Sequence, residues 1–205
     1  MEHKKEHFIG LDLGQRVDFS AFAVLTAVTH IADTRDPYYC HHKRTELLRL
    51  RDAAQCPAGL EYKKIPSVVY QIRRALGWDL NVTLAVDASG PGLPVVEMIK
   101  ASSPQAEVQA YIIVPGGAGL SMRKGIHTIG RQTLLSSLRI ALETGVIRFP
   151  GNLHCRQQLI DQILATSIEG PSTSHDDMVF ALALAVVAAS TRNPSLLKTS
   201  IGNPP

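Results

Sequence analysis

The sequence predicts an α/β protein in which a mixed β-sheet carries helices on both faces. Three apolar stretches near the N-terminus are separated by short polar turns, which predicts a meander of three strands. Amphipathic helices then alternate with short apolar strands, a pattern typical of parallel strands joined by helical crossovers. The 205 residues suffice for one domain, which we expect to span residues 1–190, followed by a flexible tail at residues 191–205 that is rich in Pro, Ser and Asn.

The first half of the chain contains the meander, a helix and a further strand. We expect meander strands at residues 8–14, 20–29 and 38–50, then an irregular loop at residues 51–59. From Tyr62 to Leu76, apolar residues recur at spacings of three and four, which predicts an amphipathic helix with Pro66 in its first turn. The apolar run Val82–Asp87 predicts another strand, and the Gly-Pro-Gly segment after it allows a close approach of the backbone.

The second half continues the alternation of helices and strands. We expect helices at residues 93–101, 128–144 and 152–166, strands at residues 108–115 and 146–149, and a glycine-rich loop at residues 116–119. Asn152 is the expected N-cap of the third of these helices. The run Met178–Ala189 is apolar on all sides, which predicts a helix buried against the sheet.

The composition is that of an ordinary soluble protein, with 45% hydrophobic and 19% charged residues. A net charge of +3 permits nucleic-acid binding without requiring it. The cysteines Cys40, Cys56 and Cys155 are far apart and form no CxxC pair, so we expect a reducing, cytoplasmic setting. The longest apolar run is too short to cross a membrane, and we expect no membrane association.

Acidic residues occur at the ends of three apolar elements. Asp12 ends the first strand, Asp87 ends the strand after the first helix, and Asp176 and Asp177 open the last helix. If the two strands are adjacent and parallel, their acids emerge at one sheet edge, to which the helix can add a third. Each site taken alone is equally compatible with an acid that caps a turn or helix.

Clustered carboxylates repel each other strongly, so each is protonated or paired unless a divalent cation lies between them. Oxygen ligands favour hard cations, so Mg²⁺ or Mn²⁺ is expected. Two such ions about 3.5 to 4 Å apart can activate a water molecule and stabilise the leaving oxygen in phosphodiester hydrolysis.

Three motifs resemble the nuclease domain of phage large terminase subunits, which has a ribonuclease H-like fold. They are Gly10–Gly14 with Asp18–Ala21, then Val86–Val96, and finally His175–Asp177 at the start of an alanine-rich helix. The resemblance implies a metal-dependent endonuclease that cuts double-stranded DNA during phage genome packaging. It implies that Asp12, Asp87 and Asp177 are catalytic metal ligands and that Asp176 and Asp18 are auxiliary carboxylates. Periodicity leaves the choice between Asp176 and Asp177 open.

Basic residues near these motifs are candidates for holding the DNA backbone. They are Arg16, Arg123, Lys124 and Arg131. Ordinary solvated surface charge explains each of them equally well.

The resemblance also concerns partners. Large terminases carry an ATPase motor, but this sequence has no GxxxxGK[ST] motif, so we expect a separate motor, a small terminase subunit or a portal as partners in the cytoplasm of a bacterial host. An excised domain, a prophage remnant and a stand-alone nuclease all remain open. The main alternative is a non-catalytic module for nucleic-acid binding or packaging assembly. A Holliday-junction-type resolvase and an actin-like ATPase are further alternatives.

Overall fold

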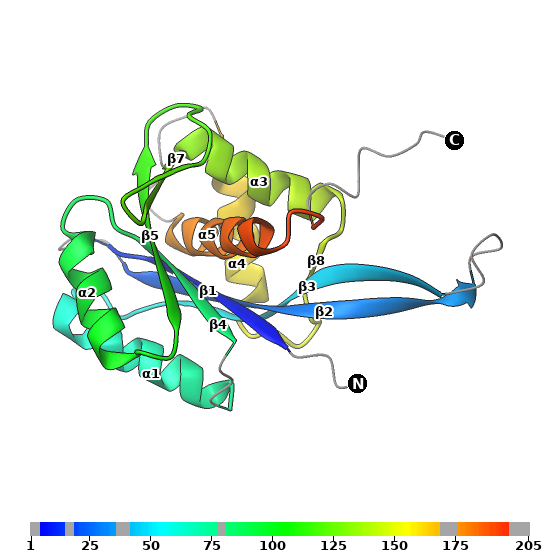
Figure 1. Cartoon of the computed structure of the whole chain (residues 1–205), viewed down its shortest axis with the longest axis horizontal. Coiled ribbons are helices and arrows are strands. Elements are labelled where there is room, and N and C mark those ends of the chain that lie inside the picture. Colours follow the sequence, from blue (N-terminus) through cyan, green and yellow to red (C-terminus); the bar gives the residue numbers. More distant parts are fainter. Residues whose placement is uncertain (1–4, 15–18, 36–41, 78–80, 169–175, 197–205) are drawn as a thin grey trace.

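The computed structural model describes residues 5–14, 19–35, 42–77, 81–168 and 176–196, with the backbone alone at residues 29–35 and 42–45. It contains an eight-stranded mixed sheet with helices on both faces (Figure 1). The strands are β1 (Glu6–Asp12), β2 (Ala21–Arg35), β3 (His42–Gln55), β4 (Val82–Asp87), β5 (Glu107–Val114), β6 (Ser121–Arg123), β7 (Ile126–Gly130) and β8 (Ile147–Arg148). The helices are η1 (Tyr62–Lys64), α1 (Ile65–Ala75), α2 (Gly92–Ser102), α3 (Arg131–Glu143), α4 (Arg156–Ala165) and α5 (Asp177–Arg192).

The strand order is β6-β7-β5-β4-β1-β2-β3-β8. Strands β1, β2 and β3 form the predicted antiparallel meander, and β4 pairs with β1 in parallel. Strands β5 and β7 continue the parallel part, because each crossover returns the chain to the same end of the sheet. The predicted meander followed by parallel strands is therefore confirmed.

Two hydrophobic cores lie on opposite faces of the sheet. One face packs against α1 and α2 through residues such as Ile9, Leu11 and Val86. The other packs against α3, α4 and α5 through residues such as Phe8 and Ala85. Alternation along each strand thus assigns every strand residue to one of two faces.

Helix α5 lies directly on β1 because Gly10 has no side chain. A Cβ atom at Gly10 would lie 1.8 Å from the carbonyl oxygen of Ala181 and 2.9 Å from the backbone nitrogen of Ala185. At the other end of α5, Arg192 forms an ion pair with Glu6, at the start of β1. The helix therefore runs antiparallel to β1, and its N-terminus lies at the end of the strand that carries Asp12.

Several sequence predictions are wrong in their boundaries. The predicted loop at residues 51–59 begins as strand, because β3 continues to Gln55 past a bulge at Arg51. The start of the predicted helix at residues 128–144 belongs to β7, which forms a hairpin with β6. Helix α4 begins at Arg156 with Cys155 at its N-cap, since Asn152 lies in successive turns that precede the helix.

The last helix continues past the predicted domain boundary. Helix α5 ends at Arg192, and Leu196 is buried in the core on the α5 face. Residues 197–205 lie outside the described part. No helix in the described residues has both the length and the apolar character needed to span a membrane.

Candidate active site

Asp12 and Asp87 are the last residues of two adjacent parallel strands. Their predecessors Leu11 and Val86 are paired, so the two acids follow at the same level, about 4.8 Å apart across the sheet by the usual strand spacing. Both belong to the α5 face, because each lies two residues beyond a residue of that face, Gly10 or Ala85. The two strands thus present neighbouring, partly buried carboxylates beneath the N-terminus of α5.

The surroundings of Asp87 hold its carboxylate in place and make its charge costly. The backbone N–H of Ser89 donates a hydrogen bond of 2.8 Å to Oδ1 of Asp87. Burial raises the pKa of Asp87, and the hydrogen bonds from Ser89 offset part of this increase. The absence of a side chain at Gly92 lets α2 begin against this strand end, since a Cβ there would lie 2.5 Å from the carbonyl oxygen of Asp87. A cation beside Asp87 would relieve the cost of its buried charge.

Asp177 extends the acidic cluster from above the sheet. It lies one helical turn before Ala181, the residue that rests on Gly10, so its side chain lies on the sheet-facing side of α5. Its Oδ2 accepts a hydrogen bond of 2.9 Å from Nε2 of Gln55, at the end of β3. Gln55 is in turn held by Gln158 of α4, whose Nε2 donates to Gln55 Oε1 at 2.8 Å.

Gln55 is a site residue that sequence reasoning missed. The register places Gln55, Ala21, Asp12 and Asp87 in one row across β3, β2, β1 and β4. Gln55 lies two residues after buried Ala53, so the two-residue period of a strand places both side chains on one face of β3. This signal can be used only once β3 is known to extend past its bulge. The row places the partner of Asp177 on the same surface as the two strand-end acids.

Asp176 has different surroundings from Asp177. It is buried, and its Oδ2 lies 3.8 Å from a terminal guanidinium nitrogen of Arg131. The Arg131 guanidinium also donates hydrogen bonds to the carbonyl oxygens of Ser167 and Ile168 and lies 5.4 Å from the centre of the Phe180 ring. These contacts give Asp176 and Arg131 partners within the fold, and the predicted metal contact of Asp176 and DNA contact of Arg131 stay predictions.

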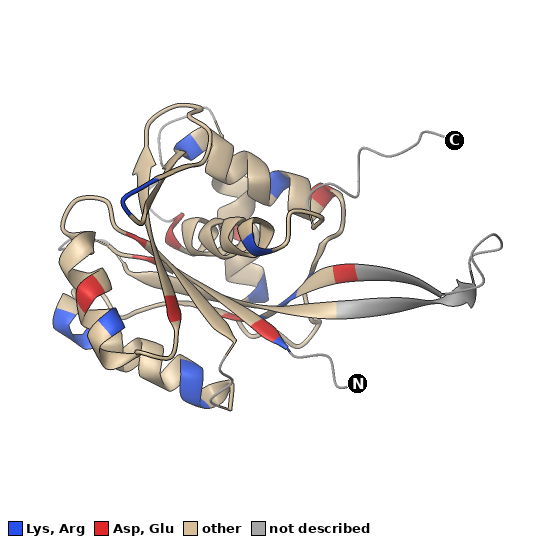
Figure 2. Ribbon diagram, viewed as in Figure 1, with Lys and Arg blue, Asp and Glu red and all other residues tan. Residues whose placement is uncertain are grey.

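The other predicted site residues are distributed more widely. Arg123 and Lys124 are exposed at the β6–β7 turn, where Lys124 (φ 51°) and Gly125 (φ 78°) form the tight connection (Figure 2). This turn lies three strand positions from β4. Arg16 and Asp18 lie outside the described residues.

An aromatic pair continues the row beyond Asp87. Tyr111 is paired with Asp87 across β4 and β5, and its ring stacks on His127 with centroids 4.7 Å apart. Burial raises the pKa of Tyr111 to about 12 and lowers the pKa of His127. Both groups are therefore neutral near pH 7.

The chemistry of the donor set, rather than a measured distance between the carboxylates, is what matches hard divalent cations at this edge. Three carboxylates from β1, β4 and α5 supply only oxygen donors, which suit Mg²⁺ and Mn²⁺. Figure 2 shows acidic segments where the strands pass beneath the start of α5. The positive end of the α5 dipole lies at the same place and favours anionic groups there.

No protein-family model matches the sequence, and no curated protein matches it. Solved structures do match. The large terminase nuclease from thermophilic phage G20c with bound zinc is 18% identical, with a TM-score of 0.54 over 89% of this chain and 81% of that one. The human cytomegalovirus terminase nuclease domain is 10% identical, with a TM-score of 0.60 over 96% and 89%. The large terminase nuclease domain from bacteriophage SPP1 with bound Mn is 11% identical, with a TM-score of 0.50 over 90% and 86%.

At these identities the similarity concerns the fold. It extends over most of this chain and most of each matched chain. The chain therefore has the ribonuclease H-like fold of terminase nuclease domains, as its motifs predicted.

Proposed function

We propose that this chain is a metal-dependent endonuclease that hydrolyses DNA phosphodiester bonds, as in the cutting of phage DNA during genome packaging. The observation that carries the proposal is the placement of Asp12 and Asp87 at the same level on adjacent strands, beneath the helix end that bears Asp177. The terminase nuclease fold supports it independently, and the SPP1 nuclease domain contains Mn.

In this proposal, Asp12, Asp87 and Asp177 hold two Mg²⁺ or Mn²⁺ ions. Such ions supply an activated water and neutralise charge that develops on the phosphate. In the row, Asp12 lies between Asp87 and Gln55, the partner of Asp177, so Asp12 is the ligand best placed to be shared by the two ions. Gln55 keeps the Asp177 carboxylate turned toward the sheet by donating to its Oδ2, and Ser89 does the same for Asp87 through Oδ1.

DNA would approach this edge from the solvent side of the strand ends. Arg123 and Lys124, exposed on the β6–β7 turn, are proposed contacts to the phosphate backbone. Such contacts position DNA without reading its sequence. Double-stranded DNA is the proposed substrate. A separate ATPase motor, a small terminase subunit or a portal are the proposed partners, in the cytoplasm of a bacterial host.

Plasmid cleavage tests the proposal. Supercoiled plasmid is incubated with the chain in Mg²⁺, Mn²⁺ or EDTA, and nicked and linear products are quantified. We expect cleavage with either metal, and a loss of more than about 100-fold in Asp12→Asn and Asp87→Asn, because even residues that only orient metal ligands are worth 10- to 100-fold. Glu97→Gln is the matched control, since Glu97 is an exposed acid of α2.

Full activity in either Asp variant would refute the assignment of the site. DNA binding without cleavage in any ion would instead support the non-catalytic module.

A further inference from the structure

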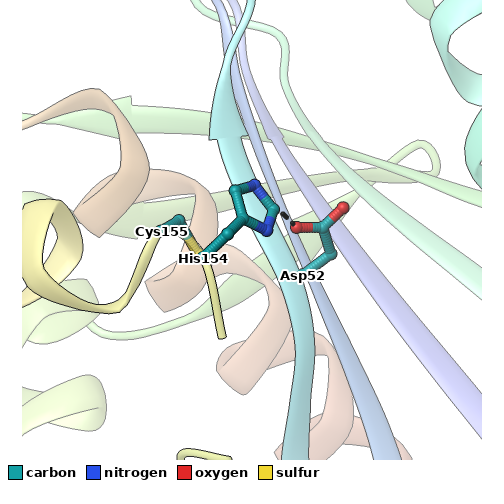
Figure 3. A group of neighbouring side chains, drawn as sticks. All are labelled: Asp52, His154 and Cys155. Atoms are coloured by element: carbon teal, nitrogen blue, oxygen red, sulfur yellow. Dashed lines mark ion pairs between the residues drawn. The ribbon is translucent and has the colours of Figure 1, made fainter. Parts of the chain in front are cut away.

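We propose that Asp52, His154 and Cys155 form a second metal site, suited to Zn²⁺, at the junction of β3 and α4. Figure 3 shows the Asp52 carboxylate facing the His154 imidazole, with Cys155 beside them. Asp52 comes from β3, and the other two residues come from the segment that leads into α4. This site is separate from the strand-end acids and does not depend on the nuclease proposal.

The distances bring the three side chains within reach of one ion. Each residue offers one ligand atom, and these atoms all lie within 4.8 Å of one another. Nε2 of His154 lies 3.7 Å from Oδ1 of Asp52. Ligand atoms on a tetrahedral Zn²⁺ are separated by roughly 3.3 to 3.8 Å, given bond lengths of about 2.0 to 2.3 Å, so small side-chain rotations suffice.

One ligand atom of the group lacks a hydrogen bond. Oδ1 of Asp52 is shielded from solvent, and among the described residues no donor bonds to it. A buried carboxylate oxygen without a partner is unfavourable, and a cation is the partner that best satisfies it. This atom, Oδ1 of Asp52, is also the one that faces His154.

A bulge in β3 immediately precedes Asp52. Leu48 and Leu50 precede the bulge and Ala53 follows it, yet all three belong to the core on the α5 face. The extra residue, Arg51, therefore shifts the alternation and leaves Asp52 on the other side of the strand.

A cavity of about 350 Å³ adjoins the group, with Asp52 and His154 in its lining. It leaves room for a fourth ligand such as water. Arg49 and Arg51 also line the cavity and favour an anionic group at that fourth position.

The donor set selects the metal. One sulfur, one imidazole nitrogen and one carboxylate oxygen suit Zn²⁺ and related transition metals, whereas Mg²⁺ and Ca²⁺ avoid thiolate. A Cys thiolate and an Asp carboxylate together balance the charge of a divalent ion. Burial raises the pKa of the Cys155 thiol, so metal binding at neutral pH must displace its proton.

A metal here would brace the α4 side of the acidic cluster. Two residues of α4 contact that region: Gln158 holds Gln55, and Oε1 of Gln162 accepts a hydrogen bond of 3.2 Å from the backbone N–H of Met178. Asp52 is three residues before Gln55 on β3. A metal ion that joins β3 to α4 would therefore hold Gln55 and Gln162, two side chains that contact the N-terminus of α5. This consequence rests on the proposed function.

Cobalt titration tests the site on the full chain. After removal of metals with a chelator, Co²⁺ is added and the absorption spectrum is recorded. We expect tetrahedral d–d bands together with a thiolate-to-cobalt charge-transfer band. Cys155→Ser should lose the charge-transfer band, and His154→Ala should weaken binding by at least about 10-fold. Because the His154 side chain is 73% exposed, His154→Ala should leave the fold intact.

The second described buried cysteine provides the matched control. Cys56→Ser should keep the wild-type spectrum, because Cys56 is not part of the group. Asp12→Asn should keep it as well, which separates this site from the proposed nuclease centre. A wild-type spectrum in Cys155→Ser, or unchanged affinity in His154→Ala, would overturn the proposal.

Discussion

The substitution Gly10→Ala tests whether the contact between β1 and α5 positions the acidic cluster. The added Cβ would lie 1.8 Å from the carbonyl oxygen of Ala181, whereas ordinary contacts begin near 3.4 Å. The obstacle is helix backbone, which cannot rotate away, so α5 must move by about 1.6 Å or β1 must bend. Overpacking of this kind costs up to about 3 kcal/mol, or more where backbone must shift. For a protein of this size that corresponds to a fall in Tm of roughly 6 to 12 °C.

Thermal unfolding followed by circular dichroism, with EDTA and with Mn²⁺, measures both effects of Gly10→Ala. We expect the lower Tm in EDTA and a smaller rise in Tm on adding Mn²⁺, because moving α5 separates Asp177 from the strand-end acids. Gly119→Ala is the control, since a Cβ at Gly119 meets no atom within 4 Å. A Tm of Gly10→Ala within about 1 °C of wild type would refute the packing argument. A lower Tm with an unchanged Mn²⁺ response would refute the link to the metal site.

Two further substitutions test the charges around the cluster. Burial raises the pKa of Asp87 in the folded protein above its value in the unfolded chain. The stability that this carboxyl contributes is therefore present at pH values below the pKa of the unfolded state, and it is lost as the pH rises through the pKa of the folded state. Asp87→Asn should therefore raise Tm in EDTA at pH 7, with the difference shrinking toward acid pH; a less stable Asn variant at pH 7 would contradict this. Arg131→Met should destabilise the fold by about 1 to 3 kcal/mol, measured by urea unfolding, because it removes the cation 3.8 Å from buried Asp176 and the hydrogen bonds to the carbonyl oxygens of Ser167 and Ile168. A variant of unchanged stability with weaker, less salt-dependent DNA binding would instead assign Arg131 to the DNA.

The positions of Asp12 and Asp87 could be predicted from the sequence because both depend on short-range rules. Each acid ends an apolar run, and an antiparallel meander of three strands followed by a helical crossover makes the fourth strand parallel to the first. Parallel neighbours end at the same sheet edge, so the shared level of the two acids follows once β4 is known to lie beside β1, which the sequence analysis had to assume. The glycines after Asp87 also behave as predicted, with Gly92 allowing the close start of α2.

Elements that depend on long-range packing could not be predicted in the same way. The sequence predicted an irregular loop from residue 51, yet the chain remains strand to Gln55 because the bulge absorbs one residue. That one-residue shift decides the face on which Gln55 lies, and hence the partner of Asp177. Likewise, β6 has only three exposed residues, which carry no apolar alternation by which a strand could be recognised.

The two adjacent acids at the start of α5 show how packing divides roles that sequence leaves equivalent. An isolated helix dipole favours a carboxylate in the first turn whichever way it points, so it cannot distinguish Asp176 from Asp177. The distinction arises because Ala181 rests on Gly10, which fixes the rotation of the helix about its axis. A residue four positions earlier shares that face, so Asp177 is directed to the sheet, while Asp176 lies beside Arg131. The missing side chain of a glycine on β1 thereby determines which acid of α5 faces the sheet, and so which acid is proposed as a metal ligand.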